Sequence, residues 1–121
     1  MNPDFKLGTE LALSLCRRAF LKGWHVAVDY REDPDDLQPM RGKDDMVKLR
    51  EDIAACDEED LVFYDLNKEY IGRVFVIYEN GCDVVCDYTT SYHAEFDNMV
   101  NEFTMSCDSP AYLLLEGMEP K

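Results

Sequence analysis

The chain has 121 residues, of which 46% are hydrophobic and 31% are charged, and its formal net charge at pH 7 is −14. This length predicts one domain, residues 1–121, with a core of its own, and the apolar content argues against wholesale disorder. Phosphate groups are bound by clustered Lys and Arg, which this chain lacks, so nucleic acid is not expected as a direct partner.

The negative charge is concentrated in the second half of the chain. Residues 1–50 contain nine acidic and nine basic side chains, whereas residues 51–120 contain seventeen acidic side chains against Lys68 and Arg73. A neutral half beside an acidic half is typical of an electrostatic field directed at a cationic partner. The alternative is that the acidity serves only solubility.

The cysteines give no sign of a disulfide framework. They are odd in number and irregularly spaced, at Cys16, Cys56, Cys82, Cys86 and Cys107. No signal peptide is expected, because the apolar run Leu11–Cys16 ends at Arg17, and no stretch approaches the length that spans a membrane. We therefore expect free thiols and a reducing cytoplasm, which would be the host cytosol if the chain is phage-encoded.

The first part of the chain predicts a helix and then a strand. After a short lead-in, Met1–Gly8, apolar residues recur at helical spacing over Thr9–Lys22, with Thr9 as the N-cap and Gly23 as the C′ glycine. The residues that follow, Trp24–Tyr30, alternate between apolar and other side chains. This alternation indicates a strand that joins the sheet.

A loop and a second helix come next. The segment Arg31–Lys43 contains two prolines and a glycine among several acids, which predicts a loop. Asp44 can cap a helix that runs to about Ala55. The acidic run Asp57–Asp60 follows at the C-terminal end of that helix, where the helix dipole favours cations. Such a local misfit suggests a functional role.

The segment Leu61–Tyr88 predicts a three-stranded antiparallel meander. Three apolar, β-branched and aromatic runs are separated by turn signals at Leu66–Glu69 and Glu79–Cys82. Asn80-Gly81 favours a two-residue type I′ hairpin turn. With that turn the register is fixed by the pairs Tyr78–Asp83, Ile77–Val84, Phe75–Cys86 and Arg73–Tyr88.

Alternation along these strands divides the meander into two faces. The expected core face carries Ile71, Arg73, Phe75, Ile77, Val84, Cys86 and Tyr88. The other face carries Gly72, Val74, Val76, Tyr78, Asp83, Val85 and Asp87. Apolar residues lie on both faces, so the pattern also allows a two-fold homodimer through the sheet.

A third helix follows the meander, with possible N-caps at Thr89, Thr90 and Ser91. The inward residues at helical spacing are Tyr92, Phe96, Met99, Val100 and Phe103. Its outer face is acidic and contains no basic residue to neutralise it. The apolar tail Ser109–Glu116 has three interpretations, which are an edge strand, a strap over the core and a dimer contact.

These elements predict an α+β fold in the order α-β-α-β-β-β-α. The sheet should be antiparallel, with the 61–88 meander at its centre and the helices mainly on one face. Neither an internal repeat nor a second domain is evident in the sequence.

No motif indicates a metal, a cofactor or catalysis. On a strand, Cys82 and Cys86 lie roughly 13 Å apart, at about 3.3 Å per residue, which is too far to share a zinc ion. Asp65–Glu69 imitates the start of an EF-hand loop, but Tyr70 replaces the required glycine and Val76 the final glutamate. The chain has no phosphate loop, catalytic elbow or nucleophile with an evident base, so we do not expect an enzyme.

Arg73 is a lone cation between Ile71 and Phe75 in the central strand, and two roles are open. It could bind a ligand carboxylate as a buried hook, in which case the protein would be a small enzyme or a ligand-binding domain. The preferred interpretation is an ion pair with a nearby acid, because an arginine at that depth must be paired.

The acidic surface is the remaining candidate for a functional site. Its predicted partner-binding residues are Asp57, Glu58, Glu59, Asp60, Tyr78, Asp83, Asp87, Glu95, Asp97 and Glu102. We expect them to form one rigid anionic surface with aromatic anchors, which would fit a cleft lined by Lys and Arg.

This surface predicts a non-catalytic inhibitor that occupies the basic nucleic-acid-binding surface of a partner protein. In size, charge and lack of catalytic motifs the chain is similar to phage and plasmid anti-restriction and anti-CRISPR proteins. That resemblance implies an inhibitor that acts like a DNA mimic and excludes the nucleic acid from its partner. The alternative is an immunity protein that neutralises a basic nuclease toxin by the same electrostatics.

Overall fold

The computed structural model describes residues 3–31, 34–90 and 92–104. Its regular elements are α1 (Pro3–Leu21), β1 (His25–Asp29), α2 (Met46–Asp52), β2 (Glu58–Tyr64), β3 (Tyr70–Ile77), β4 (Val85–Thr90) and α3 (Ala94–Phe103). Short 3-10 segments are η1 (Pro34–Asp36), η2 (Lys43–Asp45) and η3 (Tyr78–Asp83). The α+β class and the order of helices and strands confirm the fold predicted from the sequence. The predicted tail Ser109–Glu116 lies outside the described residues.

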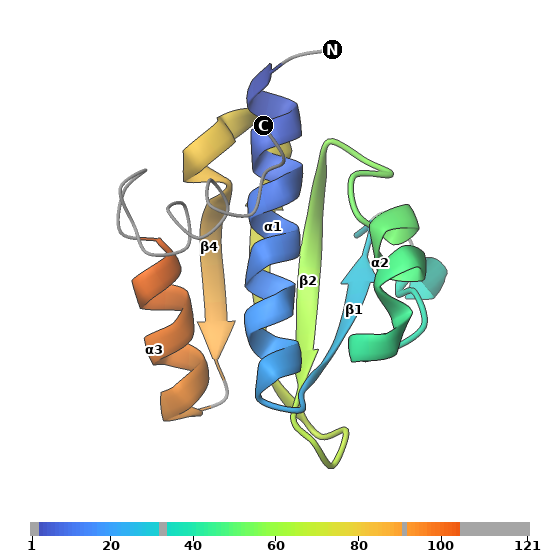
Figure 1. Cartoon of the computed structure of the whole chain (residues 1–121), viewed down its shortest axis with the longest axis vertical. Helices are drawn as coiled ribbons and strands as arrows, with labels where there is room; N and C mark the ends of the chain where they lie inside the picture. The colour runs from blue at the N-terminus through green and yellow to red at the C-terminus, as the bar shows by residue number, and fades with distance from the viewer. Residues whose placement is uncertain (1–2, 32–33, 91, 105–121) are drawn as a thin grey trace.

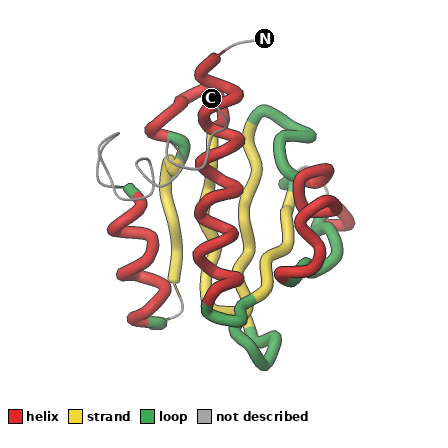
Figure 2. The backbone as a smooth tube through the Cα atoms, viewed as in Figure 1, coloured by secondary structure: helices red, strands yellow, loops and turns green. Residues whose placement is uncertain are grey.

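The four strands form one antiparallel sheet in the order β1-β2-β3-β4. Figures 1 and 2 show α1 across the middle of one face of this sheet, with α3 along β4 and α2 beside β1. Buried apolar side chains of α1, α3 and the sheet belong to one core cluster. We call this side the helical face and the other side the open face. None of the described helices is both long enough and apolar enough to cross a membrane.

Helix α1 is longer than predicted, because it begins at Pro3 and not at Thr9. Proline suits the first helical position, where its missing N–H leaves no bond unmade. Thr9 is an interior residue whose hydroxyl donates to the Phe5 carbonyl one turn earlier, at 2.9 Å. The predicted C′ glycine is confirmed, since Gly23 has φ +79 and its N–H donates to the Phe20 carbonyl.

The predicted loop after β1 is held against the sheet edge. Val26 pairs with Arg41, and Asp29 with Leu37, as isolated antiparallel bridges. Helix α2 is shorter than predicted, because η2 precedes it and Ile53 is already extended after it. The helix therefore ends at Asp52, several residues before the acidic run.

The connection between β3 and β4 is not the predicted type I′ turn. The chain forms η3 there, and the Ile77 N–H donates to the Val84 carbonyl at 2.8 Å across it. A shift between Phe75 and Val76 then offsets the ladder. The observed pairs are Arg73–Thr89, Val74–Tyr88, Phe75–Asp87 and Val76–Val85, so the predicted pairs Phe75–Cys86 and Arg73–Tyr88 are wrong.

The core face of β3 is also the reverse of the predicted one. The residues that face the helices and are buried are Gly72, Val74 and Val76, followed by Tyr78. Gly72 makes this packing possible, because a Cβ there would lie 2.5 Å from the Phe96 ring. Arg73, Phe75 and Ile77 are half-buried on the open face. Alternation defines two faces but does not say which one the helices cover.

Helix α3 buries Phe96, Met99, Val100 and Phe103, as its spacing predicts. Tyr92 does not belong to this set, since it precedes the helix and is fully exposed. The N-cap is His93, whose Nδ1 accepts a hydrogen bond from the Phe96 N–H at 3.2 Å. The threonines predicted as caps are part of β4.

Candidate functional site

The ten residues predicted to bind a partner do not form one surface. Glu59 and Tyr78 are 0% exposed, and Asp60 is 7% exposed. These three cannot contact a partner in the folded protein. The prediction that these three residues bind a partner is therefore wrong. Glu59 and Tyr78 instead connect β2 to η3, and Asp60 forms ion pairs on the open face.

Glu59 is a core residue, although it belongs to the acidic run. In β2 its neighbours Glu58 and Asp60 point to the open face, so the alternation of the strand directs Glu59 inward. The Tyr78 hydroxyl donates to Glu59 Oε1, and the Ala54 and Cys56 N–H groups donate to the two carboxylate oxygens at 3.0 and 3.1 Å.

The run is therefore not a misfit at a helix end. Burial raises the pKa of Glu59, while the hydrogen bonds from Tyr78 and the backbone oppose that rise. The pKa of Tyr78 is also raised, by burial and by the nearby Glu59 carboxylate. The pair ties the segment before β2 to η3, and the Tyr78 N–H adds a bond to the Asp57 carbonyl at 3.1 Å.

Asp60 belongs to a charge network on the open face. Arg73 donates to Asp29 Oδ2 at 2.7 Å, and its Nε lies 3.2 Å from Asp60 Oδ2. Arg31 also pairs with Asp60, at 3.4 Å, and its guanidinium lies 4.3 Å from the Phe75 ring centroid. The ion-pair interpretation of Arg73 is confirmed. Burial raises the pKa of Asp60, and the two arginines oppose that rise.

Two acidic side chains on the outer face of α3 form ion pairs with basic residues. Glu95 pairs with Lys22 at 3.4 Å, and Glu102 with Arg18 at 3.5 Å. Arg18 belongs to α1 and Lys22 directly follows it, and both lie more than seventy residues earlier in the chain than their partners. The prediction of an uncompensated acidic face on this helix is therefore wrong. Asp97 lies in the first turn of α3 and is half-buried.

Of the ten predicted residues, Asp57, Glu58, Asp83 and Asp87 are exposed and lie outside the ion pairs described above. Asp57 and Glu58, at the start of β2, line a cavity of about 670 Å³ together with Glu79 of η3. Its apolar walls include Tyr30 and Ile77. We call this cavity the acidic groove. Asp83 and Asp87 are also exposed, at the end of η3 and on β4.

The acidic groove has an unbalanced charge. Arg31 is the one basic residue that lines it in the described part of the chain, and its guanidinium is already paired with Asp60 and stacked on Phe75. Sequence reasoning missed Glu79, because it was assigned to a hairpin turn that does not form. No local sequence pattern identifies Glu79, because η3 lies beside the start of β2 through contacts between distant residues, which include the bonds from Tyr78 to Glu59 and to the Asp57 carbonyl.

The described residues contain no group of three or more His, Cys, Asp or Glu side chains that could hold a metal ion. The segment that imitates an EF-hand is a turn between β2 and β3. Asp65 Oδ1 accepts from the N–H groups of Asn67 and Glu69, at 2.8 and 3.0 Å. Cys86 is an exposed residue on β4, whereas Cys16 is buried, and burial raises the pKa of its thiol to about 12.

The chain matches no protein-family model, and it has no significant match among the curated proteins or the solved structures searched. The candidate site therefore depends on the geometry of this chain alone.

Proposed function

We propose that this protein is a non-catalytic interaction protein that binds a basic partner through the acidic groove. The partner would be a nucleic-acid-handling protein. This protein would act as its inhibitor by occupying the surface of the partner on which nucleic acid binds. The protein itself would not bind nucleic acid, and it would act in the cytoplasm.

One observation carries this proposal. Three exposed carboxylates, on Asp57, Glu58 and Glu79, line one cavity, and Arg31, the one basic side chain among its described lining residues, is already paired. A Lys or Arg side chain of a partner could place its charge among these carboxylates and its methylene stem against Tyr30 and Ile77. Opposite charges of this kind raise the association rate and select the partner.

The buried residues of the acidic run have a supporting role in this proposal. Glu59 and Tyr78 hold the two sides of the acidic groove, since one belongs to β2 and the other begins η3. A preorganised site loses less conformational entropy on binding than a mobile one. Asp83 and Asp87 would extend the negative field beyond the groove.

Affinity capture from the native host tests the proposal. The triple variant Asp57→Asn, Glu58→Gln, Glu79→Gln removes the groove charges and keeps the side-chain sizes. The matched control is Asp35→Asn, Glu51→Gln, Glu69→Gln, which removes the same charge from exposed residues outside the groove.

We expect the wild type and the control to capture the same Lys- and Arg-rich protein, and the groove variant to lose it. Equal capture by both variants would contradict the proposal, as would binding that does not change with salt concentration. Capture of a basic nuclease toxin, encoded beside this chain, would assign the protein to the immunity class.

A further inference from the structure

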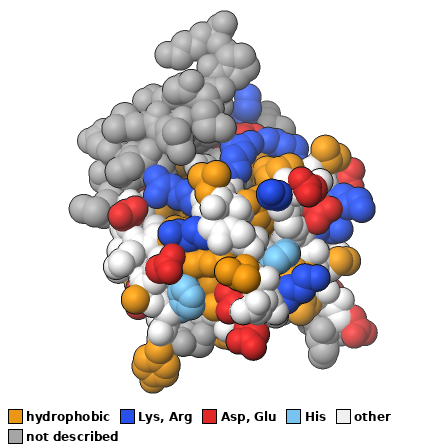
Figure 3. Space-filling view, turned by 60° about the horizontal axis from the view of Figure 1, so that its bottom comes forward, with side chains coloured by type: hydrophobic (Ala, Val, Ile, Leu, Met, Phe, Trp, Pro, Cys, Tyr) orange, Lys and Arg blue, Asp and Glu red, His pale blue; other side chains and the backbone are white. Residues whose placement is uncertain are grey.

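Large apolar side chains are exposed at the end of the molecule opposite to η3. Leu21, the last residue of α1, is 88% exposed, Leu66 in the turn between β2 and β3 is 66% exposed, and Tyr92 before α3 is fully exposed. Figure 3, which brings this end of the molecule forward, shows hydrophobic side chains among basic, acidic and histidine side chains. A single exposed apolar residue is normal, but several on neighbouring segments indicate a contact surface.

Side-chain contacts hold these three segments beside one another. Leu66 lies against the turn that ends α1, because a Cβ on Gly23 would be 3.7 Å from the Leu66 Cβ. His93, directly after Tyr92, packs its ring edge-on against Trp24, with 5.2 Å between the ring centroids. The three exposed side chains therefore belong to one surface, which we call the apolar end.

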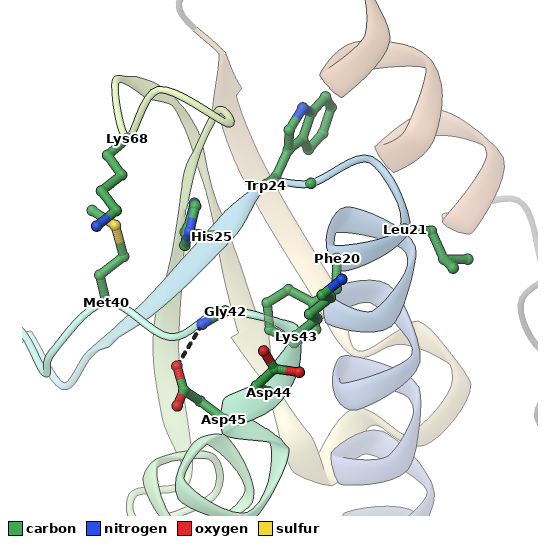
Figure 4. Close-up of a pocket in the computed structure, with 11 residues that line it drawn as sticks. Phe20, Leu21, Trp24, His25, Met40, Gly42, Lys43, Asp44, Asp45 and Lys68 are labelled. Atoms are coloured by element: carbon green, nitrogen blue, oxygen red, sulfur yellow. Dashed lines mark hydrogen bonds between the residues drawn. The ribbon is translucent and has the colours of Figure 1, made fainter.

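Leu21 stands between two cavities of the apolar end. The first has a volume of about 540 Å³ and lies between the end of α1, η2 and the turn between β2 and β3, and we call it the turn cavity. The second has a volume of about 530 Å³ and lies between α1 and α3. Figure 4 shows Leu21 directed away from His25 and Gly42, while the largely buried Phe20 and Trp24 supply apolar walls of the turn cavity. An apolar projection thus lies directly beside two hollows.

The charges that line the two cavities are balanced. Two basic and two acidic residues stand in each described lining: Lys43, Lys68, Asp44 and Asp45 in the turn cavity, and Arg18, Lys22, Glu95 and Glu102 in the second cavity. The whole chain carries a formal charge of −14, so two copies repel one another over most approaches. At the apolar end this repulsion is smallest, and a strongly charged partner would gain no attraction there.

We propose that the apolar end binds a second copy of this chain and forms a two-fold dimer. A two-fold interface uses the same surface of both copies, so that surface must be complementary to itself. The apolar end meets this requirement because it carries both a projection and a hollow. Leu21 of each copy would enter the turn cavity of the other and lie against Phe20 and Trp24. Leu66 and Tyr92 would add apolar contact area.

The dimer does not depend on the proposed function. The acidic groove is at the other end of the sheet (Figure 1), so it stays open when two copies join at their apolar ends. The two acidic grooves would then lie at the outer ends of the dimer.

Sedimentation velocity of the full chain tests the dimer, over concentrations from about 10 μM to 1 mM, where small interfaces associate. We expect the weight-average sedimentation coefficient to rise with concentration toward that of a dimer. Added salt should strengthen the association, because it screens the repulsion between two chains of charge −14. Binding of a basic partner in the acidic groove has the opposite salt dependence, so the failure of one proposal is distinguishable from the failure of the other.

Leu21→Ser should weaken the dimer about tenfold or more, as expected for the loss of a buried leucine side chain from each copy. Leu66→Ser should weaken it less. The matched control is Val47→Ser, which should leave the dissociation constant unchanged, because Val47 is 76% exposed on α2 and is not among the described residues that line either cavity. All three side chains are exposed, so the variants should fold, and circular dichroism checks this.

A chain that stays monomeric at every concentration and salt would overturn the proposal. A dimer that Leu21→Ser leaves unchanged, or that Val47→Ser weakens equally, would also overturn it. If the chain were monomeric and Leu21→Ser abolished capture of the host partner, the apolar end would belong to that partner and not to a second copy.

Discussion

Removing the buried hydroxyl of Tyr78 should destabilise the protein far more than removing the hydroxyl of an exposed tyrosine would. In Tyr78→Phe the Glu59 carboxylate keeps its two backbone donors but loses its side-chain donor, and both residues are 0% exposed. A hydrogen bond to a charged group contributes about 1.5–3 kcal/mol, and a buried acceptor left without its donor costs a similar amount. We therefore expect the free energy of unfolding to fall by about 2–3 kcal/mol.

Urea unfolding, followed by circular dichroism, measures this change. Tyr64→Phe is the matched control, because Tyr64 is half-buried on the sheet and its hydroxyl makes no hydrogen bond to another described residue. The control should change the free energy of unfolding by less than about 0.5 kcal/mol. If Tyr78→Phe were as stable as this control, Glu59 would not depend on Tyr78, and η3 would have to be held against β2 by other contacts.

The hydrogen-bonded pair of Glu59 and Tyr78 also predicts that the free energy of unfolding depends on pH. Because the pKa of Glu59 is raised, the folded protein binds more protons than the unfolded chain once the pH exceeds the ordinary glutamate value of about 4.5. The contribution of Glu59 to stability is therefore complete below that value and decreases as the pH rises through the folded pKa. In Glu59→Gln this decrease should disappear, so the stability difference between wild type and variant should shrink with rising pH. If urea titrations showed that the stability difference between wild type and Glu59→Gln grows with pH, the pKa of Glu59 would be lowered in the folded protein and not raised.

Three other substitutions or modifications test separate parts of the fold. Gly8→Ala should lower the free energy of unfolding by about 2 kcal/mol or more, measured by urea unfolding, because a Cβ at Gly8 would lie 2.1 Å from the Tyr78 carbonyl oxygen. The Cys16 thiol should resist labelling by a disulfide reagent in the native protein while the Cys86 thiol reacts, so Cys16→Ser should leave native labelling unchanged. Arg73→Met should cost about 1–2 kcal/mol in thermal or urea unfolding, because two neighbouring carboxylates lose their shared cation.

Local patterns in the sequence predicted the elements well where neighbouring residues decide them. Gly23 ends α1 because a left-handed residue is required there, and the apolar spacing of α3 identifies Phe96 and Phe103 as buried. The four strands follow from alternation and turn signals. Each of these features depends on residues within a few positions of one another.

The features that sequence reasoning missed depend on contacts between distant segments. Asn80-Gly81 would favour a tight hairpin locally, but Tyr78 is held in the core by Glu59, nineteen residues earlier, and the chain leaves the ladder after Ile77. Glu95 and Glu102 of α3 looked unpaired because their partners, Lys22 and Arg18, lie at the end of α1 and directly after it. Glu79 joins the candidate site only because η3 folds beside the start of β2.

The central claim is that the acidic groove, and not the net charge of the chain, attracts the basic partner. Association kinetics with the captured partner, measured by surface plasmon resonance over a range of salt concentrations, test this claim most directly. We predict that the groove variant associates about tenfold more slowly than the control variant at low salt, and that the two rates converge as salt screens the charges. Equal rates for the two variants at every salt concentration would contradict the claim, because both have lost the same number of charges.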